Sequence, residues 1–181
     1  LKKKIPAIFL DRDGVINKEN LNLHYQNPLK VINGAFDAVK KINEKGFLSV
    51  IVTNQSAVAK GTVTIRRVEK DHKKLEYLFS KKGSYFDRIY YCPYYPIKGF
   101  KGEVKKYKKK SKFRKPNNGM FLKAIKDLNI DTKKSYMLGD RVSDYLAAKK
   151  TGIKFLIILN KFKIKGKKNF TNIKQAINSI L

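Results

Sequence analysis

The sequence predicts an α/β protein, a three-layer sandwich in which helices cover both faces of a central parallel sheet. Short apolar runs of strand length alternate along the chain with amphipathic segments of helical periodicity, which is typical of this class. The chain has 181 residues, enough to bury one core of ordinary size without disulfides. Because we find no internal repeat and no linker, we expect residues 1–181 to form a single domain.

Five apolar runs are expected to form the strands. They cover residues 5–10, 47–53, 86–92, 135–139 and 154–159. Strands that are separated by helices usually pair in parallel, because each helix carries the chain back across one face of the sheet. The first run ends at Asp11 and lacks a small-residue cleavage site, so we interpret it as a strand and not as a signal peptide.

Amphipathic segments between the runs are expected to form the helices. They cover residues 35–45, 65–81, 119–128 and 143–152, with a short last helix after Thr171. Gly46 and Gly83 follow the first two, where glycine commonly ends a helix. Ser143 and Thr171 are good N-cap residues, because their hydroxyls can accept from the free N–H groups of a first helical turn. Two long polar segments, residues 17–33 and 93–116, interrupt this alternation of strands and helices. We expect them to contribute to a functional site, because long loops of this kind are usually functional.

Polar side chains stand where the predicted strands end. Asp11 and Asp13 follow the first strand, Thr53 ends the second, Asp140 follows the fourth, and Lys115 precedes a helix. The carboxyl ends of parallel strands meet at one edge of the sheet, where ligands bind. Carboxylates that crowd together repel one another unless a cation offsets them, and oxygen ligands favour Mg²⁺. The sequence therefore predicts a magnesium site at this edge.

The spacing of Asp11 and Asp13 suggests that the two carboxylates have different chemical roles. Successive side chains of a strand point to opposite faces, so we expect Asp11 and Asp13 to share one side and Arg12 to lie on the other, while Gly14 lets the chain turn. One carboxylate could bind the metal and attack, and the other could donate a proton to a leaving oxygen if its surroundings keep it protonated. Such a site suits phosphoryl transfer.

The net charge of +28 favours polyanions, acidic membrane surfaces or phosphorylated substrates as partners. The basic residues are nearly all dispersed lysines, which we interpret as a generally basic surface, since specific nucleic-acid sites favour arginine forks. The single cysteine, Cys92, fits a reducing compartment, and no apolar run could span a bilayer. We expect a cytoplasmic monomer without nucleic-acid or membrane partners.

Four motifs in order resemble those of the haloacid dehalogenase (HAD) phosphatase superfamily: Asp11-x-Asp13-Gly14, Thr53, Lys115 and Gly139-Asp140-x-x-x-Asp144. Within it, LDRDGVIN, VTNQS, YCP, RKPNNGM and MLGDRVSD are most similar to the D-glycero-D-manno-heptose 1,7-bisphosphate 7-phosphatases and histidinol phosphatases. The resemblance implies a Rossmann-like, HAD-like fold without a large cap domain. It also implies Mg²⁺-dependent removal of the 7-phosphate from a small phosphorylated sugar, in heptose biosynthesis for surface polysaccharide.

The same resemblance implies roles for individual residues. Asp11 would be the nucleophile that forms an aspartyl-phosphate, and Asp13 the general acid and then base. Asp11, Asp13 through its carbonyl, and Asp140 would bind Mg²⁺, while Asp144 would orient Lys115 or a metal-bound water. Thr53 and Lys115 would hold the phosphoryl oxygens, and Arg114 a second phosphate. The substrate-binding set would be Glu19, Asn20, Leu21, Asn22, Thr53, Asn54, Gln55, Ser56, Arg114, Lys115 and Arg141.

The chain departs from the family at its structural zinc site. Cys92 is present, but Tyr94 stands in place of a histidine, and Ser111 and Phe113 stand in place of two cysteines. One ligand cannot build a tetrahedral site, so we expect no zinc and a loop held by packing of Tyr94 and Tyr95 instead. Leu21 and Asn22 also replace a glycine and a tyrosine, which leaves the substrate preference open.

Other functions remain open on this evidence. Histidinol phosphate is an alternative substrate, and a polynucleotide 3′-phosphatase would share the motifs and suit the basic charge, although the chain has no tryptophan for base stacking. A phospho-accepting regulator would place its acceptor after the third strand, where Tyr91 and Cys92 stand. We interpret His24 and His72 as surface residues and not as ligands.

Overall fold

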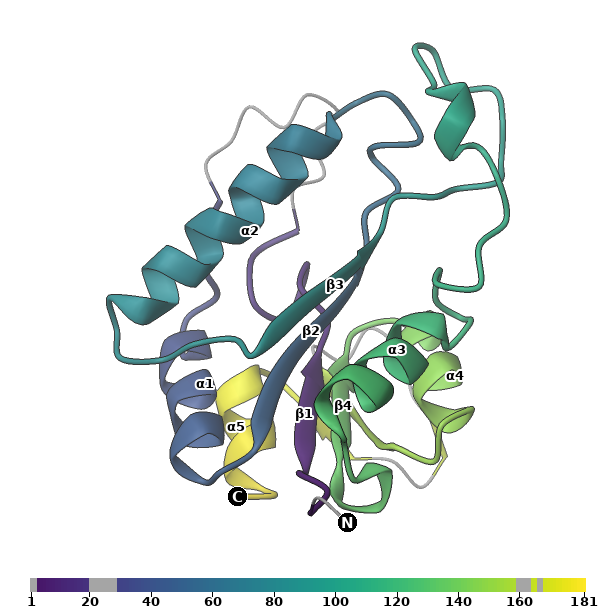
Figure 1. Ribbon diagram of the computed structural model, residues 1–181. Helices are drawn as coiled ribbons and strands as arrows, with labels where there is room; N and C mark the ends of the chain where they lie inside the picture. The colour runs from purple at the N-terminus through teal and green to yellow at the C-terminus, as the bar shows by residue number, and fades with distance from the viewer. Residues whose placement is uncertain (1–2, 20–28, 159–163, 166–167) are drawn as a thin grey trace.

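Six parallel strands form the central sheet of the computed structural model, in the order β3-β2-β1-β4-β5-β6 (Figure 1). The structure describes residues 3–19, 29–158, 164–165 and 168–181. The strands are β1 (Ala7–Leu10), β2 (Leu48–Asn54), β3 (Arg88–Cys92), β4 (Tyr136–Gly139), β5 (Lys154–Ile158) and β6 (Asn169–Phe170). β1 to β5 coincide with the predicted apolar runs. β6 lies outside them, because so short a strand leaves no periodic signal.

The predicted helices are also present. They are α1 (Ala35–Glu44), α2 (Ile65–Ser80), α3 (Gly119–Leu128), α4 (Val142–Lys149) and α5 (Ile173–Asn178), with the short 3-10 helices η1 (Lys105–Tyr107) and η2 (Thr132–Lys134). Two predicted caps are wrong. Arg141, not Ser143, is the N-cap of α4, and its backbone N–H donates to Asp144. Asn172, not Thr171, caps α5, because its side chain accepts from the N–H of Gln175.

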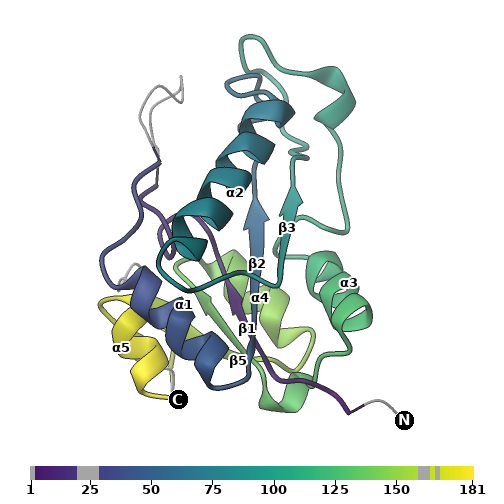
Figure 2. The same cartoon turned by 60° about the vertical axis from the view of Figure 1, so that its left-hand side comes forward.

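Helices cover both faces of the sheet, which confirms the predicted three-layer α/β class (Figure 2). Apolar side chains of α1, α2 and α5 pack on one face, against Ile8 and Leu10 of β1. α3 and α4 pack on the other, where the rings of Phe9 and Phe121 lie 4.9 Å apart. β1 is therefore apolar in both directions, as a central parallel strand requires.

The chain path opens a crevice at the carboxyl ends of the central strands. From β1 the chain adds β2 and β3 on one side and then crosses to β4, β5 and β6 on the other. Ligands bind at such a switch in a parallel sheet. The loop between β3 and α3 rises beyond these strand ends (Figure 1). In the part of the chain that the structure describes, no helix is long and apolar enough to cross a membrane.

The stability of this fold depends on the aromatic contacts of α2. Phe79 is fully buried, and its ring lies 4.6 Å from that of Phe36 and 4.5 Å from that of Phe86. We predict that Phe79→Ala lowers the free energy of unfolding by about 3–5 kcal/mol in urea denaturation, since it removes apolar contacts and leaves a cavity. Tyr77→Ala, on the exposed side of the same helix, should change it by less than about 1 kcal/mol. Equal losses for both would contradict this account of the core.

Candidate active site

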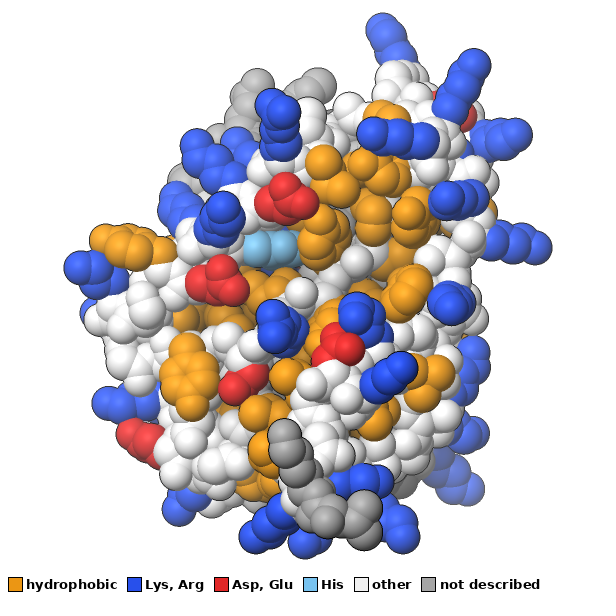
Figure 3. All heavy atoms as spheres, viewed as in Figure 1, with side chains coloured by type: hydrophobic (Ala, Val, Ile, Leu, Met, Phe, Trp, Pro, Cys, Tyr) orange, Lys and Arg blue, Asp and Glu red, His pale blue; other side chains and the backbone are white. Residues whose placement is uncertain are grey.

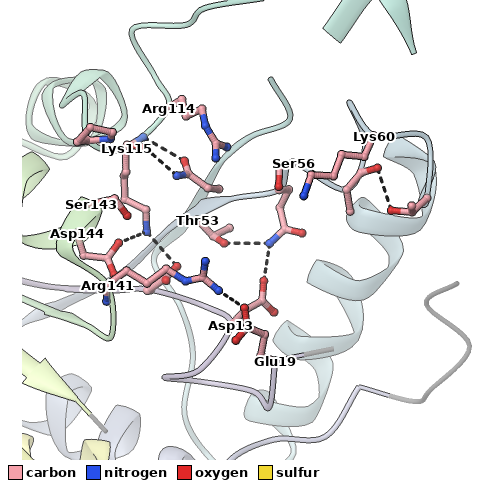
Figure 4. Close-up of a pocket in the computed structure, with 16 residues that line it drawn as sticks. Asp13, Glu19, Thr53, Ser56, Lys60, Arg114, Lys115, Arg141, Ser143 and Asp144 are labelled. Atoms are coloured by element: carbon pink, nitrogen blue, oxygen red, sulfur yellow. Dashed lines mark hydrogen bonds and ion pairs between the residues drawn. The ribbon is translucent and has the colours of Figure 1, made fainter. Parts of the chain in front are cut away.

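A pocket of about 490 Å³ opens at the carboxyl ends of the central strands (Figure 4). The predicted site residues that line it are Asp11, Asp13, Glu19, Thr53, Asn54, Gln55, Ser56, Arg114, Lys115, Arg141 and Asp144. Asp140 lies beside them in a cluster of buried acids. Asn20, Leu21, Asn22 and His24 lie outside the described residues. The described members of the predicted site therefore meet at one edge of the sheet.

The ammonium group of Lys115 joins the parts of this site. Its Nζ lies 3.0 Å from Asp11 Oδ1 and 2.7 Å from Asp144 Oδ1, and it donates to the carbonyl of Val52 at 2.7 Å. A lysine ammonium has three N–H donors, so these three acceptors can take all of them. Burial opposes the charged form, but the two carboxylates raise the pKa of Lys115 above its ordinary value. Lys115 is therefore buried and charged. We call it the clamp, because its ammonium group holds Asp11, Asp144 and the carbonyl of Val52 together.

Asn54 holds the segment that carries Lys115. Its amide Nδ2 donates to the carbonyl of Lys115 at 3.0 Å, and its Oδ1 accepts from the N–H of Lys115 at 3.1 Å. The side chain of Asn54 thus pairs with the backbone of Lys115 as a neighbouring strand would. Asn54 was expected among the substrate contacts and does line the pocket; in this structure its amide also fixes the end of β2 to the loop before α3.

Three buried carboxylates gather beside the clamp. Asp11, Asp140 and Asp144 each offer an oxygen within 4.8 Å of the others. Burial raises the pKa of Asp11, and although Lys115 opposes the rise, the charges of Asp13 and Asp140 add to it. Burial also raises the pKa of Asp144 to about 6, against the pull of Lys115. One ammonium cannot offset three carboxylates, so the donor set fits a hard divalent cation such as Mg²⁺.

Two glycines let these acids approach one another. Gly14 has a φ of 88°, and a Cβ built there would lie 2.3 Å from Asp140 Oδ2. A Cβ on Gly139 would lie 2.5 Å from the Cβ of Asp144. Neither position could accept a larger residue without moving a carboxylate, because real Cβ atoms do not come so close. The glycines of the two acidic motifs thus shape the place where a cation would bind.

Asp13 does not share the surroundings of Asp11. β1 ends at Leu10, so the alternation of side chains stops before the two aspartates, and Arg12 folds back onto Asp13. The expectation that Arg12 points away from both is therefore wrong. Burial alone would raise the pKa of Asp13, but the charge and hydrogen bonds of Arg12, with those of Asn17 and Gln55, lower it. In this structure the surroundings of Asp13 therefore favour its ionised form, whereas its role as a proton donor requires surroundings that keep it protonated.

His72 is not a surface residue, which corrects the sequence interpretation. It lies in α2 with 6% of its area exposed, and its Nε2 is 3.1 Å from Nη1 of Arg12. Burial and the charge of Arg12 lower the pKa of His72 to about 3, although Asp13 opposes the shift. This contact has no signal in the sequence, because Arg12 and His72 are far apart in the chain and the packing of α2 brings them together.

Thr53 and Gln55 form the wall opposite the acids. Both are buried, and Gln55 Nε2 donates to Thr53 Oγ1 at 2.9 Å and to Asp13 Oδ2 at 2.8 Å. The Thr53 hydroxyl can therefore turn its own hydrogen toward a ligand in the pocket, because its oxygen already accepts from Gln55. Gln55 was expected to contact substrate. In this structure its amide nitrogen bonds to Thr53 and Asp13.

Basic side chains stand at the mouth of the pocket (Figure 4). Arg114 donates to the carbonyl of Tyr94 at 3.3 Å, and its guanidinium lies 4.7 Å from the ring centre of Tyr95. Arg141 pairs with Glu19. Lys60 also lines the pocket and was missed, because one lysine in so basic a chain carries no signal. The mouth is therefore electropositive, whereas the floor is acidic.

The loop after β3 is held by aromatic and cationic side chains. The rings of Tyr94 and Tyr107 lie 5.9 Å apart, as do those of Tyr95 and Phe100. Lys108 lies over both Tyr95 and Phe100 and pairs with Glu103 at 3.2 Å. The predicted tyrosine packing in this loop is confirmed. Cys92 is buried at the end of β3, as expected, and Ser111 hydrogen-bonds to it.

The basic residues form no single stripe on the face shown in Figure 3. Blue side chains are spread over that whole face, while orange ones gather over the loop after β3. An electrostatic footprint for a nucleic acid would be expected to concentrate along one groove. The distribution on this face therefore agrees with the interpretation of a generally basic surface.

Comparisons with known proteins show the family of the chain. The chain is 40% identical over 154 residues to the D-glycero-β-D-manno-heptose-1,7-bisphosphate 7-phosphatase of Haemophilus ducreyi, covering 84% of this chain and 82% of that protein. It is 40% identical over 148 residues to the Vibrio cholerae protein of the same name, covering 82% and 77%. The chain belongs to this family of HAD phosphatases. An HAD-hydrolase-like family model matches residues 112–168 of it.

A solved structure of a relative has the same fold. The D,D-heptose 1,7-bisphosphate phosphatase of B. bronchiseptica, determined with magnesium and phosphate, superposes with a TM-score of 0.82 at 22% identity, covering 97% of this chain and 98% of that one. The HAD phosphatase fold of this chain, predicted from four short motifs, is thereby confirmed, as is its class as a phosphoric monoester hydrolase.

The role of Asn54 can be tested by separating turnover from binding. We predict that Asn54→Ala lowers kcat by about tenfold with little change in KM, because it leaves the backbone of Lys115 unpaired and lets the clamp move. Steady-state kinetics measures both constants. Asn117→Ala is the matched control, since the Asn117 amide bonds only to the carbonyl of Ser111 on the surface of the same loop. A rise in KM with an unchanged kcat would contradict this role and would support the substrate contact predicted from the sequence.

The buried His72 should make the protein sensitive to acid. Its pKa is about 3 in the folded protein and 6.5 in its ordinary state, so the unfolded chain binds a proton first as the pH falls. Stability is therefore lost between about pH 6.5 and pH 3, by up to roughly 1.4 kcal/mol per pH unit. We predict that His72→Gln loses less stability than the wild type between pH 7 and pH 5 in urea denaturation. Parallel curves would show that His72 titrates normally in the folded state.

Proposed function

We propose that this protein is a Mg²⁺-dependent phosphatase that removes the 7-phosphate of D-glycero-D-manno-heptose 1,7-bisphosphate, in heptose biosynthesis for surface polysaccharide. The observation that carries the proposal is the buried Asp11–Lys115–Asp144 cluster beside Asp140, in a chain 40% identical to proteins named for this activity. The pocket also has the required charge pattern, with an acidic floor for a metal ion and a basic mouth for a second phosphate.

Asp11 would begin the reaction. A carboxylate oxygen attacks the phosphorus of the 7-phosphate, the bond from phosphorus to the sugar oxygen breaks, and an aspartyl-phosphate forms on Asp11. Lys115 already lies 3.0 Å from Asp11 Oδ1, so it holds the nucleophile in one orientation. With Thr53 it would then offer donors to the phosphoryl oxygens, for which Lys115 must release one of its present acceptors.

Asp13 would move the protons. It donates one to the departing sugar oxygen, and in the second step it takes one from the water that releases phosphate from Asp11. Arg12 holds the carboxylate ionised in this structure, which suits the second step. A dianionic phosphate in the pocket would raise the pKa of Asp13, because like charge disfavours ionisation, and would thereby favour the proton donor of the first step.

The carboxylates of Asp11 and Asp140 and the carbonyl of Asp13 would hold Mg²⁺. When bound, the ion would offset the charge of the acids and of the phosphate. Asp144 would remain on Lys115, because its Oδ2 also accepts from the N–H of Arg141 at 3.1 Å and so fixes its direction. At the mouth, Arg114 and Arg141 would bind the phosphate on carbon 1, since guanidinium forks pair well with phosphate oxygens.

Three further features belong to the same proposal. We propose that the chain works as a monomer in the cytoplasm, that it has no nucleic-acid partner, and that it holds no zinc. The zinc proposal rests on Tyr94, Ser111 and Phe113, none of which is a usual zinc ligand. Elemental analysis of the purified protein should therefore give no stoichiometric zinc, and one zinc per chain would contradict this part.

Phosphate release from a panel of substrates tests the proposed function. With Mg²⁺, we predict that heptose 1,7-bisphosphate is hydrolysed with the highest kcat/KM, above histidinol phosphate and a 3′-phosphorylated oligonucleotide. Chelation of Mg²⁺ should abolish the activity. Asp11→Asn should abolish it too, because the amide is a poor nucleophile, whereas Asp37→Asn on the surface of α1 should leave it unchanged. Preference for the oligonucleotide or for histidinol phosphate would refute the sugar assignment.

A further inference from the structure

Arg12 stands behind Asp13 and outside the pocket. It is buried, with 1% of its area exposed, and its Nε and Nη2 donate to Asp13 Oδ1 and Oδ2 at 3.2 and 2.9 Å. Nη2 also donates to Gln55 Oε1 at 3.0 Å. These contacts hold both oxygens of the Asp13 carboxylate. The orientation of Asp13 therefore depends on where the guanidinium of Arg12 is held.

His72 meets the far side of that guanidinium. Its Nε2 lies 3.1 Å from Nη1 of Arg12. A guanidinium has donors and no acceptor, so Nε2 must be the acceptor, and the imidazole must be neutral with its proton on Nδ1. The low pKa of His72, caused by burial and by the charge of Arg12, agrees with this assignment.

The surroundings of His72 fix the imidazole in place. The ring of Tyr91, on β3, lies 5.1 Å away, and its hydroxyl donates to Glu69 on α2 at 3.0 Å. Asp71, the preceding residue, pairs with Arg67 one turn earlier at 3.0 Å. The contacts of Tyr91 join α2 to β3 beside the imidazole, so α2 presents Nε2 to Arg12 as a fixed acceptor.

We propose that His72 is a positioning residue for proton transfer: by accepting from Arg12 it keeps the Arg12 fork on Asp13, and so keeps the Asp13 carboxylate directed at the leaving oxygen. The inference rests on the proposed role of Asp13 as acid and base. No bond forms or breaks at His72 or Arg12. The proton moves between Asp13 and the sugar oxygen, and later from water to Asp13.

A comparison of two leaving groups separates this role from a merely structural one. A sugar alkoxide needs a proton as it departs, whereas p-nitrophenolate leaves without one. The constant kcat/KM includes only the steps up to departure of the first product, so the later release of phosphate from Asp11 does not enter it. Misplaced proton donation should therefore lower kcat/KM for the heptose bisphosphate and spare p-nitrophenyl phosphate.

We predict that His72→Leu lowers kcat/KM for heptose 1,7-bisphosphate by about tenfold and for p-nitrophenyl phosphate by less than about twofold. His72→Gln, whose amide oxygen can accept from Arg12, should restore the heptose value to within about threefold of the wild type. Tyr77→Phe, on the exposed side of the same helix, is the control and should change the kcat/KM of neither substrate. Equal losses on both substrates, or no loss, would overturn the proposal.

A measurement on the unaltered protein covers the case in which His72→Leu does not fold. Nitrogen-15 NMR of the imidazoles should show His72 neutral, with its proton on Nδ1, at pH 7. A proton on Nε2, or a charged ring, would overturn the proposal, since Nε2 could not accept from Arg12.

The Asp13→Asn variant distinguishes a failure of the inference about His72 from a failure of the proposed role of Asp13. If it lowers kcat/KM strongly for the heptose bisphosphate and little for p-nitrophenyl phosphate while His72→Leu does not, only the inference about His72 fails. If Asp13→Asn also leaves the heptose value unchanged, the proposed function of Asp13 fails with it.

Discussion

The ammonium group of Lys115 is the constraint on which the rest of the site depends. It is buried with two carboxylates from opposite halves of the chain, that of Asp11, which follows β1, and that of Asp144 in α4. Leaving any one of these charges unpaired in the interior would cost several kcal/mol. The ends of β1, β2 and β4 must therefore meet in one arrangement, which Asn54 and the glycines of the acidic motifs permit. That arrangement leaves an excess of negative charge, which makes the place suitable for a divalent cation.

A second network of side chains holds Asp13, the residue that we propose moves protons. Arg12, Gln55 and Asn17 converge on Asp13, whereas Lys115 serves Asp11. The two aspartates are one residue apart but have opposite electrostatic surroundings, because the strand ends before them. Burial raises the pKa of Asp11, which a bound cation would reverse, while Arg12 lowers that of Asp13. One short motif can in this way supply both a nucleophile and an acid–base group.

Much of the fold could be predicted, because its signals are local. The apolar runs of β1 to β5 and the periodicity of the helices are visible in a few neighbouring residues, and the ends of parallel strands bring Asp11, Thr53 and Asp140 to one edge. Contacts between distant residues could not be predicted in this way. In the sequence His72 is one more polar residue of a basic helix, and only the packing of α2 brings it to Arg12. Asn54 lines the pocket, but the pairing of its amide with the backbone of Lys115 has no local signal. Arg141 caps α4 through its N–H on Asp144, a carboxylate that also pairs with the distant Lys115.

A crystal structure of the protein grown with Mg²⁺ tests the central claim most directly. The account predicts one ion bound by the carboxylates of Asp11 and Asp140 and by the carbonyl oxygen of Asp13, with Asp144 still paired to Lys115. An ion bound elsewhere, or a site in which Asp144 coordinates the metal and Lys115 has left both acids, would contradict it.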